Sequence, residues 1–539
     1  MKAKFWIIRL SFVGAFCLFI FNIYTIQVQE GAYYTEQAQA QQSASGAYEV
    51  KRGTIYVTDK NNNEIPAVLN KEYPIIFAVP DDIEDPFEAA LRVSETLGLD
   101  EDRLREKFTK KGDLYELLVE RATQQQVDLI RELDIKGLHV RYETFRFYPF
   151  GDMASHVFGF IAPTETGTIE GRYGIELMYD DMLRGEQGGI FTSSEDGEDI
   201  YLTIDRTIQI QAEKVLEDLV HEWNADGGSI IVQEPTTGKI RTLANTPGFD
   251  PNVYYKADLK DYLNTSIEAV YEPGSVFKLI TMSAALDSGA VTPQTTYNDV
   301  GFVTLNSRTI RNWDLKAHGI QTMQEVLEKS LNTGTIFAEQ RTGHDTFYEY
   351  VKKFGIGEKT GIALPGEVKG SLYNLEHGRD IHYATASFGQ GISTTPIAMI
   401  NAVSAIANGG VLMRPLIRQD EEPEVIRRVI DVDTAHTMRD IMVSAVDKNV
   451  IAHIASYSVA GKTGTAFIPD FKNGGYSDNV INTFVGFAPA SDPQFTILIK
   501  LVNPQDAPLA GQTVVPAFRE LTQFLLNYYE IAPDRDISS

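Results

Sequence analysis

The chain reads Glu272-Pro273-Gly274-Ser275-Val276-Phe277-Lys278 at its most informative point, where a hydroxyl and an amine lie three residues apart after a Pro-Gly helix start. On a helix this spacing puts both side chains on one face. A serine hydroxyl attacks a carbonyl at neutral pH only if a base takes its proton, and a partly desolvated lysine with a lowered pKa can be that base. The stretch therefore predicts a nucleophile with its own base, although a helix start carrying a solvated lysine has the same sequence.

Two further motifs follow it in the chain. The first is Ser330-Leu331-Asn332, and the second is Lys462-Thr463-Gly464-Thr465. Together with Ser275 and Lys278 they give, in chain order, the SxxK, SxN and KTG set of penicillin-binding proteins and serine β-lactamases. Three short motifs in this order are far more specific than any one of them.

Second copies of two motifs occur at Lys359-Thr360-Gly361 and at Ser477-Asp478-Asn479. The copy at Lys359 lies among turn residues and is expected in a loop. The copy at Ser477 is expected in a hairpin turn, where Ser, Asp and Asn are ordinary, so no chemistry is assigned to it.

The sequence around the chosen motifs predicts regular structure. Lys462 follows an apolar run and precedes, after a Gly/Asn/Asp-rich turn, the strand-like stretch Thr483 to Ala488, which indicates a hairpin. Ser330 and Asn332 follow the helical-looking pair Val326-Leu327 and are expected at a helix end.

The chain resembles the class B penicillin-binding proteins, which are membrane-anchored peptidoglycan D,D-transpeptidases. Beyond the three motifs, the resemblance rests on six stretches between residues 50 and 400. These are Arg52-Gly53-Thr54-Ile55-Tyr56, Tyr148-Pro149-Phe150-Gly151, Gly174-Ile175-Glu176, Leu202-Thr203-Ile204-Asp205, Phe249-Asp250-Pro251-Asn252 and Ser387-Phe388-Gly389-Gln390-Gly391. A modest N-terminal domain favours the division-type branch of the family by analogy of fold.

The resemblance implies an α/β protein in which a penicilloyl-serine transferase (β-lactamase-like) domain follows a mixed α/β pedestal. We expect a cytoplasmic tail at residues 1–4, a transmembrane anchor at 5–27, a non-catalytic, dimerisation-type pedestal at 28–200 and a transpeptidase domain at 201–539. In the transpeptidase domain, an antiparallel sheet and a helical subdomain would enclose the active site. A Gly-rich, polar stretch at 185–197 suits an interdomain linker.

The anchor is predicted from the apolar stretch Phe5 to Ile26, which follows Lys2 and Lys4. Its length and flanking charge indicate a single membrane-spanning helix with a cytoplasmic N-terminus and the catalytic domain on the extracytoplasmic side. A cleaved signal peptide is the alternative, but its small-residue site at Ala38-Gln39-Ala40 lies well past the apolar run.

Composition excludes several classes of partner and cofactor. A formal net charge of −26 argues against nucleic acid and against an anionic membrane surface as partners of the external part. The single cysteine, Cys17, lies inside the expected anchor, so the external part needs no disulfide. The nine histidines form no metal-binding pattern, and we expect no metal and no cofactor.

Resemblance also implies the role of each motif residue. Ser275 would attack the carbonyl between the last two D-alanines of a stem peptide, with Lys278 as base and Lys462 as the cation that lowers the pKa of Lys278. Ser330 would pass the proton to the leaving amine, and Asn332 would hold a backbone amide of the substrate. We therefore expect peptidoglycan stem peptides and β-lactams as ligands, and a glycosyltransferase and other cell-wall or divisome proteins as partners.

The strand of the third motif is expected to bind the substrate's terminal carboxylate. Period two puts Thr463 and Thr465 on one face, and Gly464 lets an extended peptide approach as an added strand. Backbone N–H groups of Ser275 and Thr465 would form the oxyanion hole.

Two other classes of function use the same motifs. A D,D-carboxypeptidase or β-lactamase would activate water for deacylation, and its bound penicillin would turn over. A penicillin-binding sensor or scaffold would only signal on acylation, but a sensor needs a cytoplasmic output domain and only about four residues precede the expected anchor. The anchor and the large pedestal favour a wall-building transpeptidase.

Overall fold

The computed structural model describes residues 50–536, except 187, 189–193, 450–451, 471 and 507–508, together with residues 14, 16, 21, 24 and 25. The expected anchor therefore lies outside the described residues apart from those five positions. Within the described part, no helix is both long and apolar enough to cross a membrane. The chain divides into two units, residues 1–51 with 184–197 and residues 52–183 with 198–539. The elements discussed below belong to the second unit.

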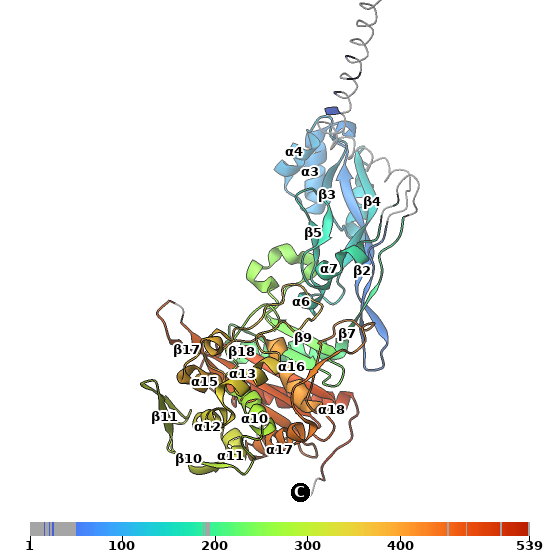
Figure 1. Ribbon diagram of the computed structural model, residues 1–539. Helices are drawn as coiled ribbons and strands as arrows, with labels where there is room; N and C mark the ends of the chain where they lie inside the picture. The colour runs from blue at the N-terminus through green and yellow to red at the C-terminus, as the bar shows by residue number, and fades with distance from the viewer. Residues whose placement is uncertain are drawn as a thin grey trace, which may run out of the picture. The chain divides into compact units, whose positions relative to one another are not determined.

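The N-terminal part of this unit is built on a five-stranded sheet in the order β3-β2-β1-β7, with β4 paired to β2 (Figure 1). Its strands are β1 (Ile55–Thr58), β2 (Glu64–Ala78), β3 (Glu116–Val119), β4 (Leu138–Phe147) and β7 (Ile200–Asp205). Only β1 and β7 run parallel. A small hairpin of β5 (Ile161–Pro163) and β6 (Ile169–Gly171) and the short helices α6 (Ser155–Phe158), α7 (Gly174–Met178) and α8 (Asp180–Arg184) complete this part.

Two helices of this part are bounded by capping residues. In α3 (Pro86–Leu97) the Asp85 side chain caps the first turn by accepting bonds from two backbone N–H groups, and Gly98 ends the helix at φ +69°. In α5 (Gln124–Leu133) Thr123 and Gln126 form a capping box. Both helices, with α4 (Glu101–Phe108), bury their apolar faces against β2 and β4.

Two of the sequence stretches that carry the resemblance meet in a buried ion network. The Glu176 carboxylate is fully buried and accepts hydrogen bonds from Arg52 Nε at 2.7 Å and Arg146 Nε at 2.7 Å. Arg52 also contacts Asp180 at 2.7 Å. Four charged groups thereby compensate one another where a lone buried charge would be costly.

The C-terminal part is built on an antiparallel sheet in the order β16-β17-β18-β8-β9. Its strands are β8 (Gly227–Gln233), β9 (Ile240–Thr246), β16 (Ala460–Pro469), β17 (Tyr476–Ala488) and β18 (Phe495–Val502). The predicted hairpin is confirmed, because Lys462 pairs with Val485 and Thr465 with Asn482 across β16 and β17. The expected antiparallel sheet with helices is therefore present.

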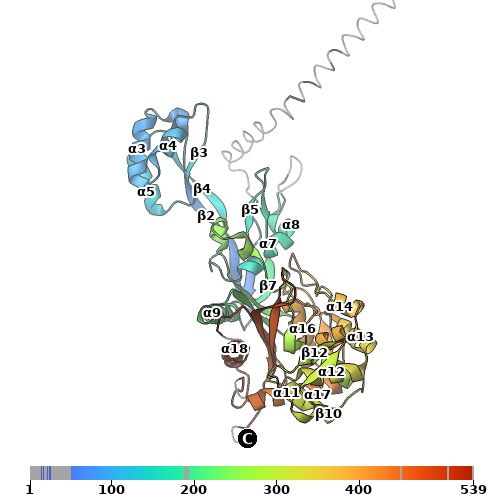
Figure 2. The same ribbon diagram turned by 90° about the vertical axis from the view of Figure 1, so that its left-hand side faces the viewer.

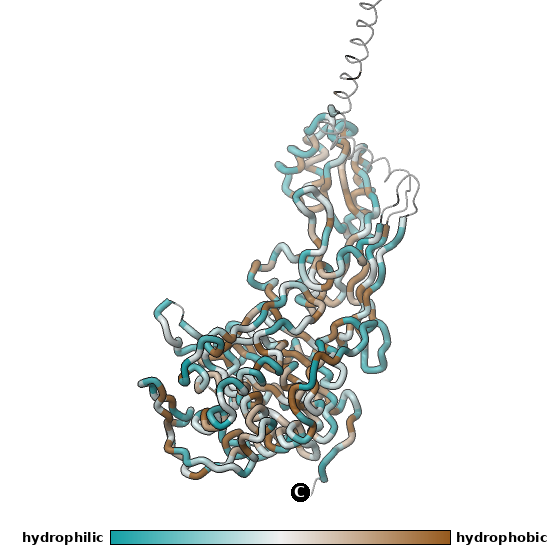
Figure 3. The backbone as a smooth tube through the Cα atoms, viewed as in Figure 1, coloured by the Kyte–Doolittle hydropathy of each residue, from teal (hydrophilic) through white to brown (hydrophobic). Residues whose placement is uncertain are grey.

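Helices cover both faces of this sheet, as Figure 2 shows. Alternate residues of β18 divide between the two cores: Ile497 and Ile499 pack with α9 (Arg206–Glu222) and α18 (Val514–Tyr528), and Leu498 packs with the helices of the opposite face. Those helices include α10 (Lys278–Asp287), α16 (Pro396–Ala407) and α17 (Val432–Asn449). Figure 3 shows the apolar segments gathered along these interior elements.

The described part of the helical subdomain that follows α10 includes five further helices and three small two-stranded sheets. The helices are α11 (Met323–Glu328), α12 (Asn332–Thr342), α13 (His344–Lys353), α14 (Tyr373–Glu376) and, before the Ser387 stretch, α15 (Asp380–Ala386). The paired strands are β10 (Thr296–Asp299) with β13 (Gly319–Thr322), β11 (Phe302–Leu305) with β12 (Arg308–Arg311), and β14 (Val411–Met413) with β15 (Val425–Arg428).

Lys500 is a buried lysine on β18, and its amine lies 5.4 Å from the centre of the Tyr271 ring. Burial lowers its pKa from 10.5 to about 8. Between about pH 8 and 10.5 the Lys500 amine is protonated in the unfolded chain and neutral in the folded chain, so the free energy of unfolding rises with pH over this range. Below about pH 8 the amine is charged in both states, and the full free-energy cost of burying the charge remains. The Lys500→Met variant should gain up to roughly 3 kcal/mol at pH 7 and lose this part of the pH dependence.

Denaturant unfolding of both proteins from pH 7 to 10.5 measures this effect. Lys260→Met is the control, since that side chain is 77% exposed. A Lys500→Met protein with the wild-type pH dependence would contradict the assignment.

Candidate active site

The nucleophile candidate sits in a tight turn directly before a buried helix. Residues Gly274–Phe277 form one 3₁₀ turn, which contains Ser275, and α10 begins at Lys278. Gly274 has φ +56°, and its N–H donates to the Gly389 carbonyl at 3.1 Å. A side chain at Gly389 would meet the Gly274 carbonyl oxygen at 2.2 Å, so this glycine supports the turn by close packing.

Lys278 joins the first motif to the second. Its amine is fully buried and donates to the Ser330 carbonyl oxygen at 2.7 Å and to Asn332 Oδ1 at 2.8 Å, with Ser330 Oγ at 3.3 Å. The helix-borne lysine of the first motif thus contacts both polar residues of the second. No described residue donates to or accepts from the Ser275 hydroxyl, which faces the pocket.

Ser330 lies between two helices, as the sequence predicts for a helix end. It follows α11, and α12 begins two residues later at Asn332. Its φ of +56° is left-handed, a conformation that a residue with a Cβ adopts at a cost. This turn directs both the carbonyl and the hydroxyl of Ser330 toward lysine amines, while Asn332 Nδ2 donates to the Arg311 carbonyl at 2.9 Å.

Lys462 reaches the same hydroxyl from the sheet. Its amine donates to Ser330 Oγ at 2.9 Å and to the Thr463 carbonyl at 3.1 Å. Ser330 Oγ therefore lies between two amines, one from α10 and one from β16. Its oxygen accepts from both amines, while its own proton remains available for another acceptor.

Both amines are held toward their neutral forms. Burial, and secondly the nearby charge of Lys462, hold the pKa of Lys278 well below its usual range. Burial lowers the pKa of Lys462 to about 7. No carboxylate among the described residues raises the pKa of either lysine, and burial is the largest cause of both shifts.

The other residues of the lysine strand have different surroundings. Thr463 Oγ1 lies 3.4 Å from the Lys462 amine. A side chain at Gly464 would meet the Pro273 carbonyl oxygen at 2.9 Å and Val276 Cγ1 at 3.0 Å, so this glycine lets the nucleophile turn pack on β16. Thr465 lines the pocket, and its hydroxyl donates to Asn482 Oδ1 at 3.2 Å.

One of the two motif copies lies where the sequence predicts and the other does not. Lys359 is in a loop, and the adjacent Thr360 N–H and hydroxyl bind Glu367 at 2.6 Å. The prediction that Ser477-Asp478-Asn479 forms the hairpin turn is wrong, because these residues begin β17 and the turn precedes them. The polar residues continue the strand between Tyr476 and Val480, which pair with Pro469 and Phe467 on either side of an irregularity in the register.

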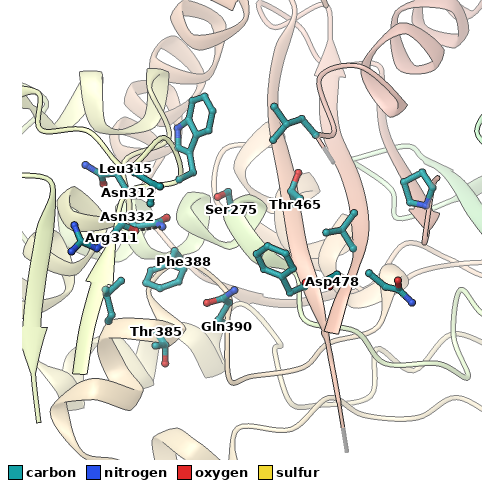
Figure 4. A pocket seen from close by; sticks show the side chains of 18 of the residues that line it. Ser275, Arg311, Asn312, Leu315, Asn332, Thr385, Phe388, Gln390, Thr465 and Asp478 are labelled. Atoms are coloured by element: carbon teal, nitrogen blue, oxygen red, sulfur yellow. Dashed lines mark hydrogen bonds between the residues drawn. The ribbon is translucent and has the colours of Figure 1, made fainter. Parts of the chain in front are cut away.

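A pocket of about 880 Å³ opens at Ser275. Figure 4 shows Ser275 between Asn332 and Thr465, with Phe388 and Gln390 below. Much of the lining comes from residues that carry no recognisable motif, so sequence reasoning missed them. Among these are Arg311, Trp313, Leu315, Gln505 and Asp506, and the lining also includes Asp478 and Asn479 of the second Ser-x-Asn copy, to which no chemistry was assigned from the sequence. Only their position next to the nucleophile in space identifies them.

Two family models match the chain. The penicillin-binding protein transpeptidase domain matches residues 228–523, and the penicillin-binding protein dimerisation domain matches residues 47–215. Together they cover both parts of the larger structural unit.

Individual proteins match over nearly the whole chain. Stage V sporulation protein D of Bacillus subtilis is 32% identical, over 94% of this chain and 83% of its own length. The probable peptidoglycan D,D-transpeptidase PenA of Neisseria gonorrhoeae is 30% identical, over 97% of this chain and 92% of its own length. Among solved structures, penicillin-binding protein 3 of Mycobacterium tuberculosis with aztreonam has a TM-score of 0.70 at 25% identity, over 90% and 98%. Penicillin-binding protein 2X of Streptococcus thermophilus has a TM-score of 0.74 at 22% identity, over 89% and 80%.

The coupling between the two buried amines can be measured directly. Replacing Lys462 by Met removes a positive charge beside Lys278 but keeps the site filled, so the pKa of Lys278 should rise while remaining below that of an exposed lysine. Titration of protein labelled with ¹³Cε-lysine, with Lys278→Met to assign the signal, gives the midpoint. An unchanged or lower midpoint would show that burial alone acts on Lys278.

Proposed function

The chain belongs to the class B penicillin-binding proteins and is a peptidoglycan D,D-transpeptidase, and from this premise we propose that Ser275 is its nucleophile. The hydroxyl would attack the carbonyl of the penultimate D-alanine of a stem peptide and release the terminal D-alanine. An amine of a second stem peptide would then take the acyl group and free the serine. A β-lactam would be trapped at the first of these steps. The position of Ser275 in the pocket, at the start of the helix that carries Lys278, supports the assignment.

We assign the role of base to Lys278. A base must be neutral before it accepts a proton, and burial beside Lys462 favours the neutral amine. Two hydrogen bonds, to the Ser330 carbonyl and to Asn332, fix the position of this amine. Lys278 lies three residues after Ser275, which is about one helical turn along the chain.

The proposed proton transfer is supported by the position of Ser330 Oγ, which lies 3.3 Å from the Lys278 amine and 2.9 Å from the Lys462 amine. A hydroxyl both donates and accepts, so Ser330 can take a proton from one side as it gives its own to the leaving amine. Lys462 would keep this hydroxyl oriented and would stabilise negative charge as it develops.

The lysine strand and Asn332 would hold the substrate. Hydroxyl groups of Thr463 and Thr465 would bind the terminal carboxylate, and Gly464 keeps the strand close to the nucleophile turn. Backbone N–H groups of Ser275 and Thr465 would form the oxyanion hole, where one donor is worth about 3 to 4 kcal/mol in other hydrolases. Asn332, which lines the pocket beside Ser275, would bind a backbone amide of the stem peptide.

We also propose the domain limits and placement expected from the sequence. A helix at residues 5–27 would anchor the protein in the cell membrane with residues 1–4 in the cytoplasm. The pedestal (28–200) and the transpeptidase domain (201–539) would lie outside. The strongly apolar composition of Phe5 to Ile26 supports the anchor. Since the chain's matched regions are a dimerisation and a transpeptidase domain, glycan polymerisation would fall to a separate glycosyltransferase, with other cell-wall or divisome proteins as further partners.

Fluorescent penicillin should label the protein covalently, and Ser275→Ala should abolish the labelling while the fold survives. Ser477→Ala, from the second Ser-x-Asn, is the matched control and should label normally, because the described partners of the Ser477 hydroxyl, the Ile468 carbonyl and the Asn479 N–H, both lie in its own hairpin. Denaturing gels measure the label, and melting curves measure the fold. Labelling of a folded Ser275→Ala protein would assign the nucleophile elsewhere.

The base role of Lys278 predicts a pH profile. Wild-type acylation rates should rise with pH as the amine loses its proton, with a midpoint below the ordinary lysine value because its pKa is lowered. Lys278→Arg keeps the charge but cannot be deprotonated, so acylation should fall by orders of magnitude at every pH. Second-order acylation rates across pH test both statements. An active Lys278→Arg protein together with a flat wild-type profile would remove Lys278 from this role.

A further inference from the structure

A closed ring of hydrogen bonds lies directly behind Thr465. It joins the lysine strand β16, the neighbouring strand β17 and the turn that precedes α18 (Val514–Tyr528). Its members are Thr465, Asn482, Ala510 and Thr513, and the last three are buried, with at most 1% of their surface exposed. Only Thr465 reaches the pocket.

The direction of each bond follows from the chemistry of the groups. Asn482 Oδ1 can only accept, so the Thr465 hydroxyl donates to it at 3.2 Å, and the Ala510 N–H donates to the same hydroxyl at 3.2 Å. Asn482 Nδ2 can only donate, and it does so to Thr513 Oγ1 at 3.1 Å. The Thr465 proton is therefore already used within the ring.

This arrangement conflicts with the proposed role of Thr465 in binding the terminal carboxylate of the substrate. A hydroxyl binds a carboxylate by donating its proton, and a carboxylate offers no proton in return. With its proton directed to Asn482, Thr465 presents only a lone pair to the substrate. A substrate carboxylate would be repelled unless the ring changes direction.

The ring contains the means for such a change. Thr465 and Thr513 carry hydroxyls, which donate or accept, and the two ends of an asparagine amide have nearly the same shape. If the amide of Asn482 turns over, its Nδ2 donates to Thr465 and its Oδ1 accepts from Thr513. Thr513 gives up its 3.5 Å bond to the Ala510 carbonyl, which still accepts from the N–H groups of Thr513 and Val515, and the Thr465 proton is released toward the pocket.

We propose that Asn482 is a positioning residue that turns its side-chain amide over when a substrate or β-lactam carboxylate binds, so that Thr465 becomes a donor to it. The proposal rests on the carboxylate-binding role given to Thr465 above. It makes a buried residue, remote from the reacting atoms and outside the three motifs, a determinant of affinity for anionic acyl donors. The effect lies mainly in binding before acylation, because the carboxylate contact is present in both the ground state and the transition state.

Replacement of Asn482 by Asp tests this directly. The new side chain has the same shape, but when ionised it only accepts, so the Thr465 proton stays committed to it. Second-order acylation by penicillin should fall about 10- to 100-fold, the size expected for losing a hydrogen bond to a charged group, and chiefly through a weaker pre-acylation complex. Asn482→Ala frees the hydroxyl and should lose less. A purely structural role predicts the reverse order, since Asp fills the site and Ala leaves a cavity.

The pH profile gives a second readout. Burial raises the pKa of the introduced carboxyl, and its protonated form again supplies a donor. The rate of Asn482→Asp relative to wild type should therefore recover as pH falls. A ratio that stays constant with pH would overturn the proposal.

A double-mutant cycle with Thr465→Val separates this mechanism from simple charge repulsion. If Asn482 acts through Thr465, the effect of Asn482→Asp should vanish in the Thr465→Val background, whereas repulsion of the ligand would persist there. Should Asn482→Asp fail to fold, the same cycle with the neutral Asn482→Ala applies, and additive effects would again overturn the proposal. Melting curves monitor the fold of each protein.

The same measurements distinguish failure of the premise from failure of the inference. If Thr465→Val acylates at the wild-type rate while Thr465→Ser does too, Thr465 does not bind the carboxylate and the proposed substrate role is wrong. If Thr465→Val is impaired, Thr465→Ser is active and Asn482→Asp is normal, the substrate role stands and only the role of Asn482 is refuted.

Discussion

The structure of the site depends on the burial of one amine. Lys278 is fully enclosed, and two of its hydrogen bonds go to the segment Ser330 to Asn332, far away in the sequence. A charged ammonium in such a place would be costly without a carboxylate, so the surroundings favour the neutral form. The left-handed turn at Ser330 exists to bring a carbonyl and a hydroxyl to this amine, and the strain of that turn is offset by the bonds it makes.

Lys462 and Lys278 act on one hydroxyl from two different layers of the fold. One comes from the edge strand of the sheet and the other from the helix packed beside it. Gly464 and Gly389 hold these layers together, since a side chain at either position would collide with the nucleophile turn. Close packing of backbone on backbone thus sets the distance between the lysines, and that distance sets their electrostatic coupling.

Local sequence signals predicted local structure well. Helix α3 has an aspartate cap, a first-turn proline and a terminal glycine, and the lysine strand has a hairpin partner nearby. The three motifs meet around Ser330. What the sequence could not supply was long-range pairing: Asn482, which follows Asp478 and Asn479 on β17, belongs to no motif. Its importance arises because it lies opposite Thr465 in the register.

The strand order has a consequence for how the protein is made. Strands β8 and β9 come early in the sequence of the domain, but β8 pairs with β18, which lies near the end of the chain. During synthesis from the N-terminus, the sheet therefore cannot close until the last strands emerge, and contacts this distant slow folding. Ser275 and Lys278 are synthesised long before Lys462 arrives beside Lys278. The segments that build the site therefore come together only as the last strands of the sheet are added.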